Sequence, residues 1–144
     1  MVPVSANLEG VTGAARLDHV TLVATDFTAS LAFYDAALAP LGLARAAEFG
    51  DEEESDAAVE AAGWGPPDGA PLLWVVTGPA ASRNAHLSLR ASGRSAVEAF
   101  YAAALSAGGT AHDAPRRWAI FRRGEFNAVV RDPDGNTVEA VAPE

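Results

Sequence analysis

The segment LDHVTLVATDFTASLAFYDAALAPLG, residues 17–42, is repeated later in the chain as NAHLSLRASGRSAVEAFYAAALSAGG, residues 84–109. A shift of 67 positions places His19 on His86 and also superimposes a Phe-Tyr pair and a glycine of the two copies. Alanine matches alone could reflect the alanine-rich composition, but these rarer residues at one common shift indicate an internal duplication. The domain is therefore predicted to contain two copies of one supersecondary unit.

Each copy begins with a segment that alternates like a strand. In LDHVTLV, the apolar Val20 and Leu22 point to one face, and the polar His19 and Thr21 point to the other. The second copy, AHLSLR, alternates in the same phase. The apolar face of each strand must be covered, and an amphipathic helix follows each time.

The two expected helices span about residues 28–39 and 95–107, each with a Phe-Tyr pair on its apolar side. These aromatic pairs are expected to pack the helix on the sheet. Ser95 and Glu98 predict a capping box at the start of the second helix. Gly108-Gly109 predicts a left-handed stop at its end.

Three shorter strand-like segments follow each helix, and DPDGN at residues 132–136 predicts a hairpin turn before the last one. The predicted fold class is α+β, with two tandem β-α-β-β-β modules that form a U-shaped mixed sheet (an open barrel) with the helices outside. Residues 1–15 are expected to be a flexible N-terminal arm. Residues 16–142 are expected to form a single domain, with module one at about 16–78 and module two at about 84–142.

Composition excludes several classes of function. The net charge of −9, from 19 acidic and 10 basic residues, disfavours nucleic acid as a partner. No apolar run approaches the roughly 18 to 20 residues that cross a bilayer, so no membrane partner is expected. The absence of cysteine excludes disulfides and thiolate sites, and the absence of lysine excludes Schiff-base chemistry. The N-terminus does not resemble a signal peptide, which favours a cytoplasmic location.

Three strands carry candidate metal ligands on their polar faces, namely His19, His86 and Glu139. Two neutral imidazoles and one carboxylate suit a divalent ion such as Fe, Mn, Ni, Co or Zn and leave coordination positions open. A single strand histidine is more often a surface residue. The symmetry of the two histidines nevertheless favours one divalent metal ion per site.

Four segments resemble the vicinal oxygen chelate superfamily, which includes glyoxalase I, fosfomycin-resistance proteins, type I extradiol dioxygenases and bleomycin-binding proteins. They are LDHVTL…SLAFYDAALAPLGL, AHLSL, AVEAFYAAALSAGG and DPDGNTVEAV, and the similarity covers about residues 16–142. The resemblance implies a metal-dependent enzyme, a glyoxalase-like lyase or an extradiol-type dioxygenase, whose small substrate chelates the metal through vicinal oxygens. It also implies a homodimer, and a Glu139 that is both metal ligand and catalytic proton carrier.

The chain departs from glyoxalase I at one ligand. That enzyme usually has a further glutamate on the last strand of the first module. Anchoring Gly69 on Gly135 places Leu73 opposite Glu139, with Trp74 adjacent, so no carboxylate is expected there. Whether a fourth protein ligand exists stays open.

Other family chemistries also leave questions open. An extradiol enzyme also uses a histidine near the metal that is not a metal ligand. The one histidine left for such a role is His112, which falls in a predicted loop or edge strand, where a surface role is the simplest interpretation. Fosfomycin-type thiol transfer would need a cationic cradle, which the arginines of residues 116–123 could supply. Aromatic residues and arginines that could line the substrate pocket are Trp74, Trp118, Phe126, Arg117 and Arg122, with Trp64 and Phe121 as further aromatic candidates.

The alternative function is a metal-independent, antibiotic-binding protein that resembles the bleomycin-resistance members. The acidic surface suits a cationic ligand, whereas the retention of all three candidate ligands argues against a metal-free role. A member that kept the fold and lost the chemistry is a third possibility.

Overall fold

The computed structural model describes residues 7, 9–10, 12–50, 60–118 and 124–144. In chain order its elements are β1 (Val20–Ala24), α1 (Phe27–Leu38), the short 3-10 helix η1 (Ala39–Leu41), β2 (Ala44–Phe49), β3 (Ala61–Gly65), β4 (Leu73–Thr77), β5 (His86–Arg90), α2 (Arg94–Ser106), β6 (Thr110–Arg117), β7 (Glu125–Arg131) and β8 (Thr137–Pro143). This order confirms the predicted repetition of a β-α-β-β-β module.

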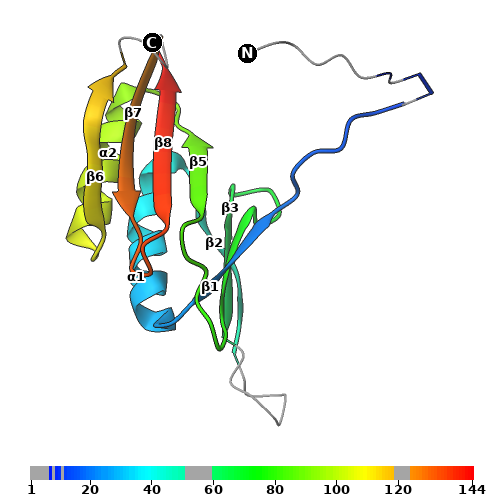
Figure 1. Cartoon of the computed structure of the whole chain (residues 1–144), viewed down its shortest axis with the longest axis vertical. Helices are drawn as coiled ribbons and strands as arrows, with labels where there is room; N and C mark the ends of the chain where they lie inside the picture. The colour runs from blue at the N-terminus through cyan, green and yellow to red at the C-terminus, as the bar shows by residue number, and fades with distance from the viewer. Residues whose placement is uncertain (1–6, 8, 11, 51–59, 119–123) are drawn as a thin grey trace.

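The strands form two four-stranded sheets of identical topology, β1-β4-β3-β2 and β5-β8-β7-β6 (Figure 1). In each sheet the first and last strands of the module pair in parallel, and the other pairs are antiparallel. Both sheets are therefore mixed, and the α+β class is confirmed. Among the described residues the two sheets are not hydrogen-bonded to each other, so the strands do not close into a barrel.

The core lies between the helices and one face of the sheets. Helix α2 packs on β6, β7 and β8, while α1 packs on α2 and on the first sheet. Phe33, Tyr34 and Phe100 are at most 1% exposed in this core, as expected for aromatic residues that hold a helix to a sheet. The opposite face of the second sheet is left for polar side chains. No helix in the described residues is long and apolar enough to cross a membrane.

The helices begin at different kinds of cap. Asp26 caps α1 and its carboxylate accepts a hydrogen bond from the backbone N–H of Ala29 at 3.0 Å. The capping box predicted for α2 is wrong, because α2 begins at Arg94 after Gly93, with no side-chain cap. Ser95 is thus already inside the first turn, where its hydroxyl cannot occupy the capping position.

The predicted stop after α2 is confirmed. Gly108 has a φ of +99°, in the left-handed region that favours glycine. The backbone N–H of Gly109 then donates to the carbonyl of Ala104 at 2.9 Å. A Cβ on Gly109 would lie 2.6 Å from Phe33 Cε2, so glycine is also required for the close contact between the modules.

The predicted DPDGN turn connects β7 to β8, with Gly135 at a φ of +92°. The buried carboxylate of Asp132 accepts hydrogen bonds from the backbone N–H groups of Asp134 and Asn136, at 2.9 Å each. It also accepts the hydroxyl of Tyr34 from α1 at 2.7 Å. One turn residue therefore ties the second module to the helix of the first.

Candidate metal centre

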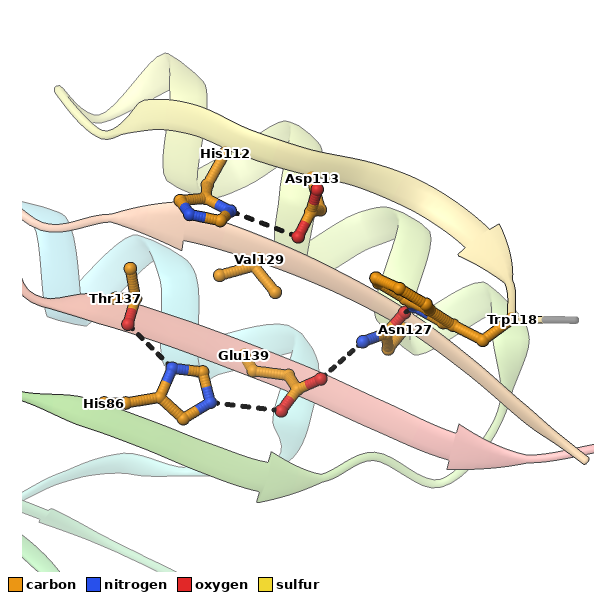
Figure 2. Close-up of a pocket in the computed structure, with 8 residues that line it drawn as sticks. All are labelled: His86, His112, Asp113, Trp118, Asn127, Val129, Thr137 and Glu139. Carbon is orange, nitrogen blue, oxygen red and sulfur yellow. Dashed lines mark hydrogen bonds and ion pairs between the residues drawn. The ribbon is translucent and has the colours of Figure 1, made fainter. Parts of the chain in front are cut away.

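A pocket of about 230 Å³ opens on the polar face of the second sheet (Figure 2). The eight residues that line it come from four strands and from the residue after β6, and they are His86, His112, Asp113, Trp118, Asn127, Val129, Thr137 and Glu139. Alternation places these side chains opposite the core. On β8, for example, Val138 and Ala140 are buried against the helices, whereas Thr137 and Glu139 line the pocket, as the sequence predicts.

The ring of His86 is held by its neighbour on β8. His86 Nδ1 lies 2.7 Å from Thr137 Oγ1, and that hydroxyl donates to the carbonyl of Ala85 at 3.4 Å. When Nδ1 carries the ring proton, it donates to Oγ1. A neutral His86 ring then directs the lone pair of Nε2 toward Glu139.

The carboxylate of Glu139 is buried and fixed at both oxygens. Its side chain is 2% exposed, Oε1 lies 3.3 Å from His86 Nε2, and Oε2 accepts a hydrogen bond from the amide Nδ2 of Asn127 (Figure 2). The Asn127 amide is oriented in turn, because its Oδ1 accepts a hydrogen bond from the indole N–H of Trp118. Sequence reasoning missed Asn127, and it placed Thr137 on the face of Glu139 without giving it a role; the available signal was a polar residue on the pocket face of each strand.

The His86–Glu139 couple fits a cation. In the tautomer with the proton on Nδ1, Nε2 and the carboxylate oxygen are both acceptors, so their approach to 3.3 Å leaves a place for a shared proton or metal ion. Two ligand atoms at about 2.0 to 2.2 Å from one ion, at coordination angles of about 90 to 110°, lie about 2.8 to 3.6 Å apart. The donor set of one imidazole and one carboxylate, each oriented by a hydrogen-bonded partner, would suit two of the ligands of a divalent metal ion.

The third predicted ligand, His19, does not line this pocket. It precedes β1, its side chain is 48% exposed, and its Nδ1 lies 2.7 Å from the carboxylate of Asp18. In the described part of the chain, no three His, Asp or Glu side chains converge so as to hold a metal ion. The structure thus brings together two of the three predicted ligands, His86 and Glu139.

Comparison with known families shows which family the chain belongs to. A family model, described as the Glyoxalase/Bleomycin resistance protein/Dioxygenase superfamily, matches residues 16–140. The chain belongs to this superfamily. No curated protein sequence matches the chain.

Solved structures of the superfamily have the same fold. A glyoxalase/bleomycin resistance protein from Albidiferax ferrireducens T118 has a TM-score of 0.69 and 26% identity, over 88% of this chain and 98% of that one. A glyoxylase/bleomycin resistance protein/dioxygenase domain from Frankia sp. EAN1pec has a TM-score of 0.65 and 15% identity, over 92% and 100% of the two chains. Glyoxalase I from Zea mays has a TM-score of 0.63 and 16% identity; 89% of this chain covers 47% of that enzyme.

The strand register changes which residue of the first module corresponds to Glu139. In glyoxalase I, a member of the superfamily, this position usually carries the fourth metal ligand. Thr21 pairs with Trp74 on β4, and its repeat equivalent Ser88 pairs with Glu139 on β8. Trp74, and not Leu73, is therefore equivalent to Glu139, because the connection after Gly69 is one residue longer. Leu73 is fully buried in the core, and the absence of a carboxylate at this position holds in either register.

Trp74 instead forms part of an aromatic surface on the first sheet. Its ring stacks on that of Phe49 with centroids 5.8 Å apart, and Phe49 is 62% exposed. Gly63 lies beneath, where a Cβ would come within 3.0 Å of the indole. Of the other predicted pocket residues, Trp118 lines the second-module pocket described above.

Of the remaining candidates, Phe126, Trp64 and Arg117 do not line this pocket. Phe126 and Trp64 point into the core, since β7 and β3 direct them toward the helices. Arg117 on β6 pairs with Glu144, which raises the pKa of the guanidinium and lowers the pKa of the carboxylate. Arg122 and Phe121 lie outside the described residues. His112 occupies the edge strand β6, and its side chain lines the pocket.

Proposed function

We propose that the chain is a metal-dependent enzyme that binds one divalent ion through His86 and Glu139 and acts on a small substrate with vicinal oxygens. The observation that carries this proposal is the 3.3 Å approach of Nε2 and Oε1, each oriented by a hydrogen-bonded neighbour. The pocket of about 230 Å³ is below the usual 300 to 1,000 Å³ range of drug-sized ligands. It suits a molecule of a few carbon atoms.

The residues that line the pocket have separate roles in this proposal. When bound, the ion would supply Lewis-acid polarisation of the substrate oxygens. His86 and Glu139 hold the ion, Thr137 sets the ring orientation of His86, and Asn127 keeps the Glu139 carboxylate from rotating. Trp118 and Val129 form the apolar wall that excludes water from the substrate.

The third protein ligand in this proposal is His19 of a second copy of the chain. His19 and His86 are equivalent in the duplicated sequence, yet His19 lies half-exposed outside the pocket of its own chain. A twofold dimer that faces module one of each copy toward module two of the other would complete two equivalent sites. The homodimer is thus part of the proposed function.

Metal content tests the ligand set directly. Untagged protein purified without chelator should contain about one divalent ion per chain by elemental analysis. His86→Ala and Glu139→Gln should each lose the ion, whereas Glu98→Gln, on the exposed side of α2, should retain it. A full complement of metal in the His86→Ala protein would contradict the proposal.

Mixing two inactive variants tests where the third ligand comes from. His19→Ala and His86→Ala should each lose metal as pure dimers. After denaturation together and refolding, a mixed dimer regains one intact site of its two, so random pairing should restore about a quarter of the wild-type metal content. No restoration would place His19 with His86 in one chain, or remove His19 from the site.

A second candidate function has an observation of its own. The exposed, stacked Phe49–Trp74 pair and the net charge of −9 suit a bulky cationic ligand that binds without metal. Metal-stripped protein should then bind a cationic aromatic drug with micromolar affinity, and Trp74→Ala should weaken that binding at least tenfold. Unchanged binding by Trp74→Ala would eliminate this function for the aromatic pair.

A further inference from the structure

The edge strand β6 brings two neighbouring side chains into the pocket. Successive residues of a regular strand point to opposite faces, so His112 and Asp113 should diverge. The pairing with β7 instead steps from Ala111↔Val130 to Asp113↔Val129, which leaves His112 as an extra residue in a β-bulge. Both side chains consequently line the pocket (Figure 2).

The bulge creates an imidazole–carboxylate couple. His112 Nδ1 lies 3.1 Å from Asp113 Oδ2, and the two side chains are 36% and 29% exposed. Since a carboxylate accepts, Nδ1 donates, and the neutral ring keeps its lone pair on Nε2. An oriented imidazole with an unprotonated Nε2, half-open to a pocket, is the arrangement of a general base.

This couple faces the proposed metal ligands across an apolar floor. Asp113 pairs with Val129 and Val129 pairs with Glu139, so the three residues form one row across β6, β7 and β8. Because neighbouring strands lie about 4.8 Å apart, the backbones of Asp113 and Glu139 are separated by about 10 Å. Besides His112, Asp113 and Glu139, the ionisable side chain among the described residues that lines the pocket is that of His86, which lies beside Glu139.

Glu139 itself is poorly placed to carry a proton. One oxygen is held by Asn127 and the other faces His86, so neither can swing toward a substrate without breaking a contact. The proton-transfer role is therefore better served from the opposite rim of the pocket.

We propose that His112, oriented by Asp113, is the proton-transfer residue of this pocket, for a small α-hydroxycarbonyl substrate; this rests on the proposed metal-binding function. Nε2 takes the proton from the carbon beside the carbonyl. The C–H bond breaks, an N–H bond forms, and the electron pair enters the C=C bond of an enediolate. The π pair of the carbonyl moves onto the carbonyl oxygen as the C=C bond forms, and return of the proton from Nε2 to the same carbon restores the carbonyl and completes the exchange, with no oxidant or reductant.

Proton exchange in deuterium oxide tests this role. Zn²⁺-reconstituted protein should catalyse deuterium incorporation at the hydroxymethyl carbon of hydroxyacetone, followed by NMR. His112→Gln should lower the rate at least 100-fold, and Asp113→Asn should lower it less, with metal content unchanged in both. Asp68→Asn, on an exposed turn, is the matched control and should exchange like the wild type.

The tautomer of His112 gives a readout that does not depend on turnover. In the metal-loaded protein, ¹⁵N NMR should show His112 protonated at Nδ1 and unprotonated at Nε2, and Asp113→Asn should remove that preference. Wild-type exchange rates in His112→Gln, the opposite tautomer, or no exchange by metal-loaded wild-type protein would each overturn the proposal for His112. A wild-type protein that binds no metal would instead overturn the proposed function.

Discussion

At the scale of single residues, the pocket is defined by hydrogen bonds that fix orientation. Asn127 is 1% exposed and joins Trp118 to Glu139, since its carbonyl oxygen accepts from the indole and its amide donates to the carboxylate. The indole N–H can only donate, so it determines which way the amide points. Asn127 thereby sets the orientation of a proposed metal ligand.

Replacement of Asn127 should expose this role. Asn127→Ala removes the donor to Glu139 and should weaken Co²⁺ or Zn²⁺ binding by about 10- to 100-fold, the usual effect of losing an outer-shell partner. Titration calorimetry on the apo-protein measures the change. Ser88→Ala, which removes an exposed hydroxyl cross-strand from Glu139, is the matched control and should bind like the wild type. Equal affinities for all three proteins would contradict a role for Asn127.

Sequence alone reaches part of this residue-level picture. His86 and Glu139 could be predicted because strand alternation and the repeat place both on the polar face. The approach of His112 to Asp113 could not, because it depends on a β-bulge, and the sequence GTAHDAP contains no mark of that extra residue. Likewise, alignment of the turn glycines predicts Leu73 as the equivalent of Glu139. The strand pairs show that the equivalent residue is Trp74, one position later.

At the scale of elements, the duplicated module packs its two helices against each other at a glycine. Gly109 follows α2, and a Cβ there would lie 2.6 Å from the Phe33 ring and 2.8 Å from the carbonyl oxygen of Ala104. Phe33 is fully buried, so its ring cannot turn aside into solvent. The contact links the end of one module's helix to the core of the other.

Gly109→Ala should therefore destabilise the protein by about 1 to 3 kcal/mol, as expected when an atom is forced into a packed core. Urea denaturation followed by tryptophan fluorescence measures the free energy of unfolding. Gly50→Ala offers a matched comparison, since a Cβ there meets nothing within 4 Å, and it should change stability by less than about 0.5 kcal/mol. Equal effects of the two substitutions would count against the close contact.

The elements themselves were largely predictable, and their ends were less so. The sequence pattern suggested a segment for each strand and both helices, although not every strand has one buried face: β1 alternates, whereas β2 has no buried residue and β3 is buried at every residue. The start of α2 was missed because Ser95 and Glu98 match a capping box, whereas Gly93 begins the helix with no side-chain bond to mark it. A local capping pattern competes with the tertiary packing of the helix, and in α2 the side chains of Val97 and Phe100 are buried in the core.

At the scale of the whole molecule, the two modules are joined by polar groups as well as by the apolar core. Asn136 donates to the carbonyl of Ser82 at 2.8 Å and accepts from the backbone N–H of Ala85 at 3.0 Å, which fastens the last turn to the segment between the modules. The hydroxyl of Tyr34 reaches the same turn at Asp132. This hairpin thus adds polar links between the modules to the apolar contacts of the shared core.

Tyr34 makes this link sensitive to alkaline pH. Burial, and then the charge of Asp132, raise the pKa of the Tyr34 phenol well above its usual value of about 10. The protonated form therefore stabilises the fold fully below pH 10, and this contribution is lost as the pH rises toward the folded-state pKa.

Tyr34→Phe should lower the free energy of unfolding by about 1.5 to 3 kcal/mol at pH 8, because it deletes a hydrogen bond to a carboxylate. The difference should narrow above pH 10 in urea denaturation. The chain has no lysine and one other tyrosine, so few other groups titrate there, and a constant difference from pH 8 to 11 would contradict this account.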